Sequence, residues 1–312
     1  MAPVRIWTRT ACARCWRYDI PMQLADPPFT LPAAAWRAHL ALEYERRAVH
    51  GSEHGSERTV LAARRHDGPL LVQKSLYPEG DSVCHSIIVH PPAGIAGGDS
   101  LEIDARIGAQ GHALLTTPGA GKWYRSAGAW AQQRNRFVVD EGACLEWLPQ
   151  ATIVFDGALA RLDTEVRLAA DARYIGWEIL CLGRAGSGER FARGQCVARV
   201  AVLRDGKPLW MERAGIAAGG LLMRSAAGWG GSTVCGTLNA VAQNVQALDL
   251  GPCRAVTAKS GHTAVTRLPG VIVARYLGDS SEAAAHYFAE LWRLLRPLIA
   301  GRAAVAPRIW NT

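Results

Sequence analysis

Three acidic residues lie in sequence settings where carboxylates are unusual. Asp99 closes a glycine-rich turn, Glu178 interrupts the apolar run 175–180, and Glu212 follows two large apolar residues. An acid that faces a protein interior is unfavourable unless it is paired, hydrated or bound to a metal. If these acids share a water-filled interior, they offer weak oxygen ligands for a divalent cation. If they point outward, or pair with Arg184 or Arg213, they are ordinary acids.

Cys84 and His85 form a second pair of metal-binding residue types. Adjacent residues of a strand point to opposite faces, so one ion could bind both only if the strand were distorted. A packed thiol beside a hydrogen-bonded histidine is the simpler alternative. The chain has no His-Glu-x-x-His motif, and no second ligand pair follows the Cys12-x-x-Cys15 motif, so no tight zinc site is predicted.

Two other chemistries are disfavoured by their missing residues. The segment 119–122 ends like a phosphate-binding loop, but Thr116 stands where the first glycine belongs and Trp123 where a serine or threonine belongs. Nucleotide binding is therefore not predicted. No Gly-x-Ser-x-Gly nucleophile elbow occurs either. A hydrolase triad built from residues distant in the sequence stays open, because triads do not follow one sequence order.

The elements that position these residues are mostly β-strands. Apolar residues alternate with polar ones in segments 40–44, 101–107 and 162–168, which is the pattern of half-buried strands. Further short apolar runs follow at near-regular spacing, separated by turn signals such as Asp67-Gly68-Pro69 and Asp205-Gly206. The sequence therefore predicts a mainly β fold of many short strands.

Two helices are also predicted. The clearer one spans 281–296, with Asp279 or Ser280 as its N-cap and Pro297 helping to stop it. Its apolar residues follow helical spacing, so we expect this stripe to pack on the sheet; a groove in a partner protein is the alternative. A weaker helix is predicted over 237–247, ended by the segment 249–252.

Composition sets limits on the class of protein. Of 312 residues, 49% are hydrophobic and 20% are charged, which is typical of a folded chain. The longest run without charged or strongly polar residues, 214–223, is far shorter than the roughly 20 residues of a membrane-spanning helix. The net charge is +8, but the arginines are scattered without interleaved aromatics, so neither nucleic acid nor membrane is a predicted partner. We interpret the charge as a composition bias with solvated arginines; an acidic protein partner is the alternative. The eight cysteines predict mostly free thiols in a reducing compartment.

Residues 1–30 differ from the rest of the chain. Four arginines precede the first acid, Asp19, and no signal-peptide core is present. We interpret this segment as a poorly ordered extension, or as the product of an upstream start codon with Met22 as the natural beginning. The predicted β-rich domain spans 31–312.

Six blocks, in order, resemble the UreD (UreH) family of urease accessory proteins, and the resemblance covers roughly residues 36–312. The blocks are Pro78-Glu79-Gly80 with Cys84-His85, His90 to Asp99, Thr117 to Ser126, Leu145 to Gln150, Trp177 to Glu189, and Pro307-Arg308-Ile309-Trp310. Two departures occur: Gly121 stands where relatives often have a hydroxyl residue, and Glu178 where some carry aspartate.

The resemblance implies a cytoplasmic scaffold and not an enzyme. It implies binding to UreF, which recruits the nickel-carrying GTPase UreG, and contact with the urease subunits. The implied fold is a mostly antiparallel β-superhelix with about two helices. The implied site is an internal tunnel for Ni²⁺ in transit, with no tightly bound cofactor. Path residues under this hypothesis are Asp99, Glu178 and Glu212, with Cys84 and His85 as further candidates.

Two rival hypotheses stay open. One is a β-rich hydrolase or lyase that uses Asp99, Glu178 and His85; the other is a structural adaptor with no metal path. For partner binding, Trp292 and Trp310 are the candidates, because exposed aromatic residues often anchor interfaces.

Overall fold

The computed structural model describes residues 35–48 and 57–311. The predicted N-terminal extension, with Cys12, Cys15 and Met22, lies outside the described residues. So does the predicted domain boundary near residue 30.

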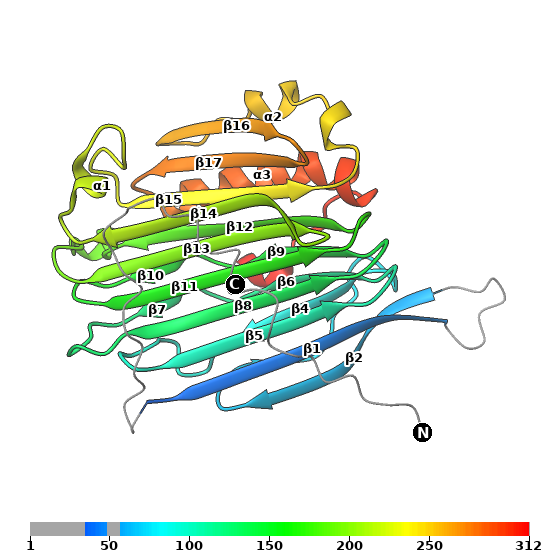
Figure 1. Ribbon diagram of the computed structural model, residues 1–312, viewed down its shortest axis with the longest axis horizontal. Helices are drawn as coiled ribbons and strands as arrows, with labels where there is room; N and C mark the ends of the chain where they lie inside the picture. The colour runs from blue at the N-terminus through cyan, green and yellow to red at the C-terminus, as the bar shows by residue number, and fades with distance from the viewer. Residues whose placement is uncertain (1–34, 49–56, 312) are drawn as a thin grey trace.

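Two β-sheets lie face to face (Figure 1). The seven-stranded sheet contains, in spatial order, β14 (Lys207–Ala217), β13 (Gln195–Arg204), β11 (Leu159–Leu168), β8 (Ala131–Val139), β5 (Ser100–Ile107), β1 (Arg37–Ala48) and β2 (Glu57–Asp67). The ten-stranded sheet runs through β16 (His262–Leu268), β17 (Val271–Gly278), β15 (Val234–Val241), β12 (Arg173–Leu182), β9 (Cys144–Leu148), β6 (His112–Thr116), β4 (Cys84–Val89) and β3 (Leu71–Val72). Two short strands, β10 (Thr152–Val154) and β7 (Gly121–Trp123), extend it beside β12.

The chain winds between the sheets as a superhelix, which confirms the predicted mainly β architecture. The strands β5, β8 and β11 lie in one sheet, and the strands that follow them, β6, β9 and β12, lie in the other. Each coil therefore adds one strand to each sheet in the same direction as the coil before it.

The prediction that most strands pair antiparallel is wrong. Among the described strands, nine pairings are parallel and six are antiparallel. Strands that occupy equivalent places in successive coils run in the same direction and therefore pair in parallel. The antiparallel pairs are β1 with β2, β3 with β4, β13 with β14, and those that join β12, β15, β17 and β16.

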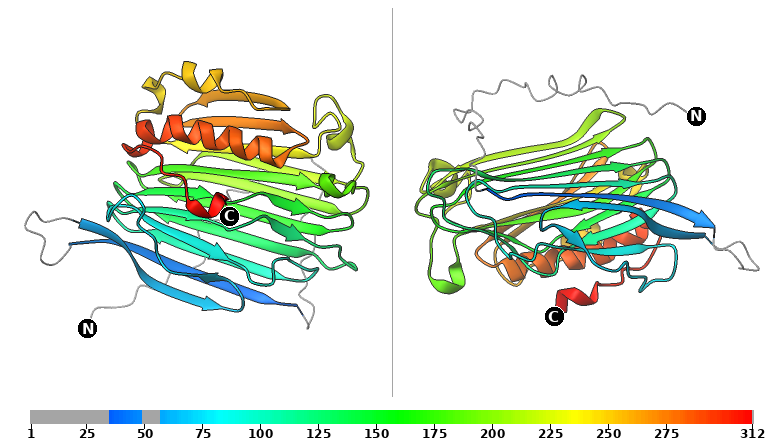
Figure 2. Two further views of the ribbon diagram at one scale, coloured as in Figure 1. Left: turned by 180° about the vertical axis from the view of Figure 1, so that it is seen from behind. Right: turned by 90° about the horizontal axis from the view of Figure 1, so that it is seen from below.

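Two hydrophobic cores hold the layers together. One lies between the sheets and includes Tyr44, Leu115, Phe137 and Trp147. The other lies between the ten-stranded sheet and the long helix α3 (Ser281–Ala300), which covers the outer face of that sheet (Figure 2). The ten-stranded sheet is consequently buried on both faces, whereas the seven-stranded sheet shows one face to solvent.

Helix α3 confirms the clearer helix prediction but not its end. Ser280 is the N-cap, because its Oγ accepts a hydrogen bond from the Ala283 amide at 3.1 Å. The apolar stripe packs on the sheet as expected. The prediction that Pro297 helps stop the helix is wrong, since the helix continues to Ala300 and ends at Gly301 with φ of 69°. Burial of Ile299 and Ala300 favours the extra turn despite the missing amide of proline.

The weaker helix prediction is wrong. Residues 234–241 form β15, and only a 3₁₀ turn (Val245–Ala247) follows it. Most residues of β15 are buried, so apolar residues occur on both of its faces, and such a pattern does not distinguish a strand from a helix. Two other short helices occur in the described chain, α1 (Leu221–Arg224) and α2 (Gly251–Ala255). The segment 249–252, which was expected to end the predicted helix, instead contains the start of α2.

Candidate functional site

Strand β12 carries Glu178 into the space between the sheets. Its alternate residues Ile175, Trp177 and Ile179 belong to the core under α3, so Glu178 points the other way. Gly176, on the same face, makes room for the Tyr174 side chain, since a Cβ atom there would lie 2.0 Å from the Tyr174 hydroxyl oxygen. The alternation of β12 thus turns a half-buried carboxylate toward the space between the sheets.

A cavity of about 520 Å³ lies next to Glu178, between β12, β15 and β17 on one side and β13 and β14 on the other. Glu178 and Glu212 both line it. Glu212 Oε1 accepts a hydrogen bond from Arg275 Nη1 at 2.6 Å. Exposed residues such as Arg213 and Ala227 also line the cavity, so it reaches the surface beside α1.

A second cavity of about 310 Å³ also includes Glu178 in its lining. Its polar wall contains Asn135, Thr164 and His90, and it reaches the exposed loop 118–122. Burial lowers the pKa of His90 below its usual value, against the raising effect of Asp99, so the imidazole is neutral at pH 7. The two cavities therefore have one acidic residue in common.

The surroundings of Glu178 shift the pKa of its carboxyl group toward neutral pH. Burial raises its pKa to about 7, and the negative charges of Glu212 and Asp163 add to the rise. A hydrogen bond of 2.5 Å from Thr164 Oγ1 to Glu178 Oε1 acts in the opposite direction. Near neutral pH the group is therefore present in both the protonated and the ionised form.

Of the three predicted acids, the structure brings two together. Glu178 and Glu212 line the same cavity, and Glu212 forms an ion pair with Arg275. Asp99 lines neither of these two cavities. It is buried, with Oδ1 accepting from the Trp36 amide at 3.0 Å and Oδ2 from the Ala96 amide at 2.8 Å. Its carboxylate fixes a turn to the start of β1.

Cys84 and His85 point to opposite faces of β4, as predicted, but both are buried. Cys84 belongs to the core between the sheets. His85 Nε2 bonds to Glu79 Oε1 at 2.6 Å on the outer face, so the hydrogen-bonded histidine is the arrangement found. Neither residue lines either of these two cavities.

The expectation that Trp292 is an exposed anchor is wrong. Trp292 is fully buried, and its Nε1 donates to Glu146 Oε2 at 2.5 Å. Trp310 is half-buried, with its ring 5.7 Å from that of Trp292 and 5.6 Å from that of Trp177. Its Nε1 donates to Thr116 Oγ1 at 2.8 Å. Both tryptophans stabilise the attachment of the C-terminal segment to the sheet.

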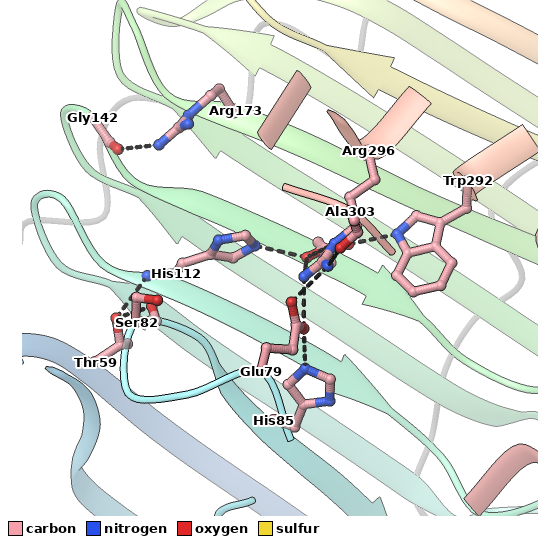
Figure 3. Close-up of polar contacts among 11 residues, drawn as sticks. Thr59, Glu79, Ser82, His85, His112, Gly142, Arg173, Trp292, Arg296 and Ala303 are labelled. Atoms are coloured by element: carbon pink, nitrogen blue, oxygen red, sulfur yellow. Dashed lines mark hydrogen bonds and ion pairs between the residues drawn. The ribbon is translucent and has the colours of Figure 1, made fainter. Parts of the chain in front are cut away.

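A buried charged cluster beneath α3 was not predicted (Figure 3). We call it the clasp cluster; its members are Glu79, His85, His112, Glu146, Trp292 and Arg296. Arg296 donates from Nη1 and Nη2 to Glu79 at 2.7 Å each, and from Nε to both oxygens of Glu146 at 3.0 Å. It also donates to the Ala303 carbonyl. The guanidinium thus joins three segments of the chain.

The charges of the clasp cluster balance internally. Burial alone would raise the pKa of Glu146, but His112 and Arg296 outweigh it and hold the pKa at about 2. Burial alone would lower the pKa of His112, but Cys144 and Glu146 raise it to about 9. At neutral pH the buried carboxylates are therefore ionised and neutralised by cations, which makes this cluster a structural tie and not a vacant ligand set.

The enzyme hypothesis does not fit this arrangement. Asp99 is bonded to backbone amides, His85 lies on the outer face with Glu79, and Glu178 lies between the sheets. These three residues form no common site.

Among the described residues, no three His, Cys, Asp or Glu side chains gather to hold a metal ion. The six cysteines of the described chain are all free thiols. None of the described helices is both long and apolar enough to span a bilayer.

The family model of the UreD urease accessory protein matches residues 37–311 of this chain. A urease accessory protein UreD of Dechloromonas aromatica (strain RCB) is 56% identical over 283 residues, covering 89% of this chain and 95% of that protein. Those of Azoarcus sp. (strain BH72) and Pseudomonas aeruginosa (strain PAO1) are 54% and 48% identical, each covering 89% of this chain and 94% and 96% of the relative. This chain belongs to the UreD family, a family of urease accessory proteins and not of enzymes.

Proposed function

We propose that this protein is a scaffold and a nickel-delivery conduit for maturation of the urease metallocentre. In this proposal it acts in the cytoplasm on apo-urease, in complex with UreF and, through UreF, with UreG. Nickel is cargo and not a resident cofactor. The family name supports the accessory role, and the free thiols of the described cysteines agree with a reducing compartment.

One observation carries the conduit. Glu178 lines both internal cavities, and each cavity reaches exposed residues, one beside α1 and the other at the loop 118–122. In this proposal a cation enters one cavity, binds Glu178, and leaves through the other cavity.

The ligand chemistry agrees with transit. A path needs ligands strong enough to offset dehydration and weak enough to release the ion. Isolated carboxylates, an amide and hydroxyls meet this requirement, whereas a closed set of Cys and His ligands would retain Ni²⁺ tightly. Glu212 provides a second carboxylate in the larger cavity, moderated by Arg275.

The test is the nickel content of urease matured in cells that carry Glu178→Gln. This change keeps the size and removes the charge, so we expect urease with less nickel while the accessory complex still co-purifies. Glu178→Asp retains a carboxylate and should restore most of the nickel. Glu43→Gln, on an exposed strand position, is the surface control. Normal nickel loading with Glu178→Gln would refute the conduit and leave an adaptor without a metal path. Failure to co-purify with UreF or urease would refute the scaffold.

A further inference from the structure

A chain of hydrogen bonds crosses the interior from one sheet to the other. Asn135 on β8 donates from Nδ2 to Thr164 Oγ1 at 3.0 Å, and Thr164 on β11 donates from Oγ1 to Glu178 at 2.5 Å. Asn135 and Thr164 are direct partners in the register of β8 with β11. Both are buried, at 6% and 3% exposed. The chain therefore links the seven-stranded sheet to the carboxylate of the ten-stranded sheet.

The direction of this chain is fixed by its donors. Gln133 donates from Nε2 to Asn135 Oδ1 at 3.1 Å, which leaves the Asn135 amide nitrogen to donate to Thr164. A hydroxyl has one proton to donate, and here the oxygen already accepts from Asn135. The Thr164 proton is thus directed at Glu178, and the asparagine orients the threonine.

The chain ends at Glu178, the residue that lines both of these cavities. Asn135, Thr164 and Glu178 line the smaller cavity, and Glu178 also lines the larger one. The neighbouring residues of β13, Ala198 and Val200, line the larger cavity next to β11. A cation that moves between the cavities consequently passes the carboxylate that Thr164 binds.

We propose that Thr164 is a positioning residue that moderates the hold of Glu178 on a divalent cation and returns to the carboxylate as the cation leaves. This inference rests on the proposed conduit and adds the residue that sets how fast the cation is released from Glu178. The hydroxyl and the cation compete for the same carboxylate oxygen. Release then exchanges one partner of Glu178 for another, so the buried charge is never left without a partner.

The proposed role of Thr164 predicts that loss of its hydroxyl strengthens cation binding. Thr164→Val keeps the shape and removes the competing hydroxyl, so Glu178 should bind a cation more tightly and release it more slowly. A variant that merely damaged the fold would weaken binding instead. We expect the affinity for Ni²⁺ to rise about tenfold, the size of effect that loss of one hydrogen bond to a charged group gives. Thr164→Ser retains the hydroxyl and should bind like the wild type.

The experiment is titration of the full-length chain with Ni²⁺ by calorimetry, together with stopped-flow release to a chelator. Both are done at one fixed pH above the pKa of Glu178, because loss of the Thr164 hydrogen bond raises that pKa and protonation would otherwise compete with Ni²⁺. The expected result is tighter binding and slower release for Thr164→Val, and a smaller change of the same sign for Asn135→Ala, which loses the orienting amide. Thr266→Val, at an exposed position of β16, is the matched control. Circular dichroism establishes that each variant is folded.

The outcomes separate the two proposals. If Glu178→Gln abolishes the nickel binding but Thr164→Val and Asn135→Ala bind and release like the wild type, the role of Thr164 is refuted and the conduit stands. If Thr164→Val binds more weakly while folded, the role is also refuted. If Glu178→Gln leaves nickel binding unchanged, the conduit itself fails, and the inference fails with it.

Discussion

Replacement of Glu178 by glutamine should stabilise the protein at neutral pH. In the folded chain burial raises the pKa of Glu178 to about 7 from its ordinary value of 4.5. An acid with a raised pKa contributes its full stability below its unfolded pKa and loses it as the pH rises through the folded pKa. Ionised Glu178 is therefore a cost to folding that glutamine, being neutral, does not carry.

The magnitude follows from the size of the rise. The difference between 4.5 and about 7, at roughly 1.4 kcal/mol per pH unit, corresponds to about 3 kcal/mol. The free energies of unfolding of Glu178→Gln and wild type should be nearly equal at pH 4.5. Between pH 4.5 and 7.5 the variant should gain up to about 3 kcal/mol over the wild type, with little further change above that.

The assay is urea denaturation followed by tryptophan fluorescence at a series of pH values. Groups other than Glu178 titrate in both proteins, so their effects cancel in the difference. Glu43→Gln, at an exposed position, should show no such pH-dependent difference. A constant difference across the pH range, or a variant less stable than the wild type at pH 8, would contradict the assigned burial of an ionisable carboxylate.

Three further outcomes test the structure by denaturation. Glu146→Ala should lower the free energy of unfolding by about 3–5 kcal/mol, because it removes the carboxylate partner of buried His112 and one of the two carboxylate partners of buried Arg296. Glu290→Ala at an exposed pair should cost less than about 1 kcal/mol, and similar costs for the two variants would contradict the clasp cluster. Ser280→Ala should cost about 1 kcal/mol by removing the N-cap of α3, and no loss of stability would argue against that cap. Gly194→Ala should cost more than about 1 kcal/mol, because φ is +101° and a Cβ atom would lie 2.3 Å from a backbone oxygen. Gly186→Ala, with no atom within 4 Å, is the control, and equal tolerance of both changes would contradict the backbone described for Gly194.

The sequence marked Glu178 as an unusual acid but left its face of the strand open, because only local information was used. An acid in a run of large apolar residues indicates burial, and strand alternation places it opposite Trp177. The direction of the strand pairs was not predictable in the same way. Alternation of polar and apolar residues looks the same in parallel and antiparallel strands, and only the connections decide between them.

The remaining differences come from contacts between distant segments. Asp99 looks available in the sequence, but its partner, the Trp36 amide, lies 63 positions away. Arg296 lies 150 positions from Glu146, so neither predicts the other. A signal did exist: Arg296 follows Trp292 by four positions and so interrupts the apolar stripe of the helix, as Glu146 interrupts the run 143–148. Two opposite charges in apolar settings would have been reason to expect a buried pair.

The clasp cluster can form only late in translation of the chain. Glu79 and Arg296 are 217 positions apart, so the carboxylate leaves the ribosome long before the guanidinium is translated. Until then the outer face of the ten-stranded sheet has neither its cation nor its covering helix. Closure of that face must therefore follow almost complete translation of the chain. A premature stop codon before residue 281 would remove α3 and leave an apolar surface with two acids beside it, exposed to chaperones and proteases.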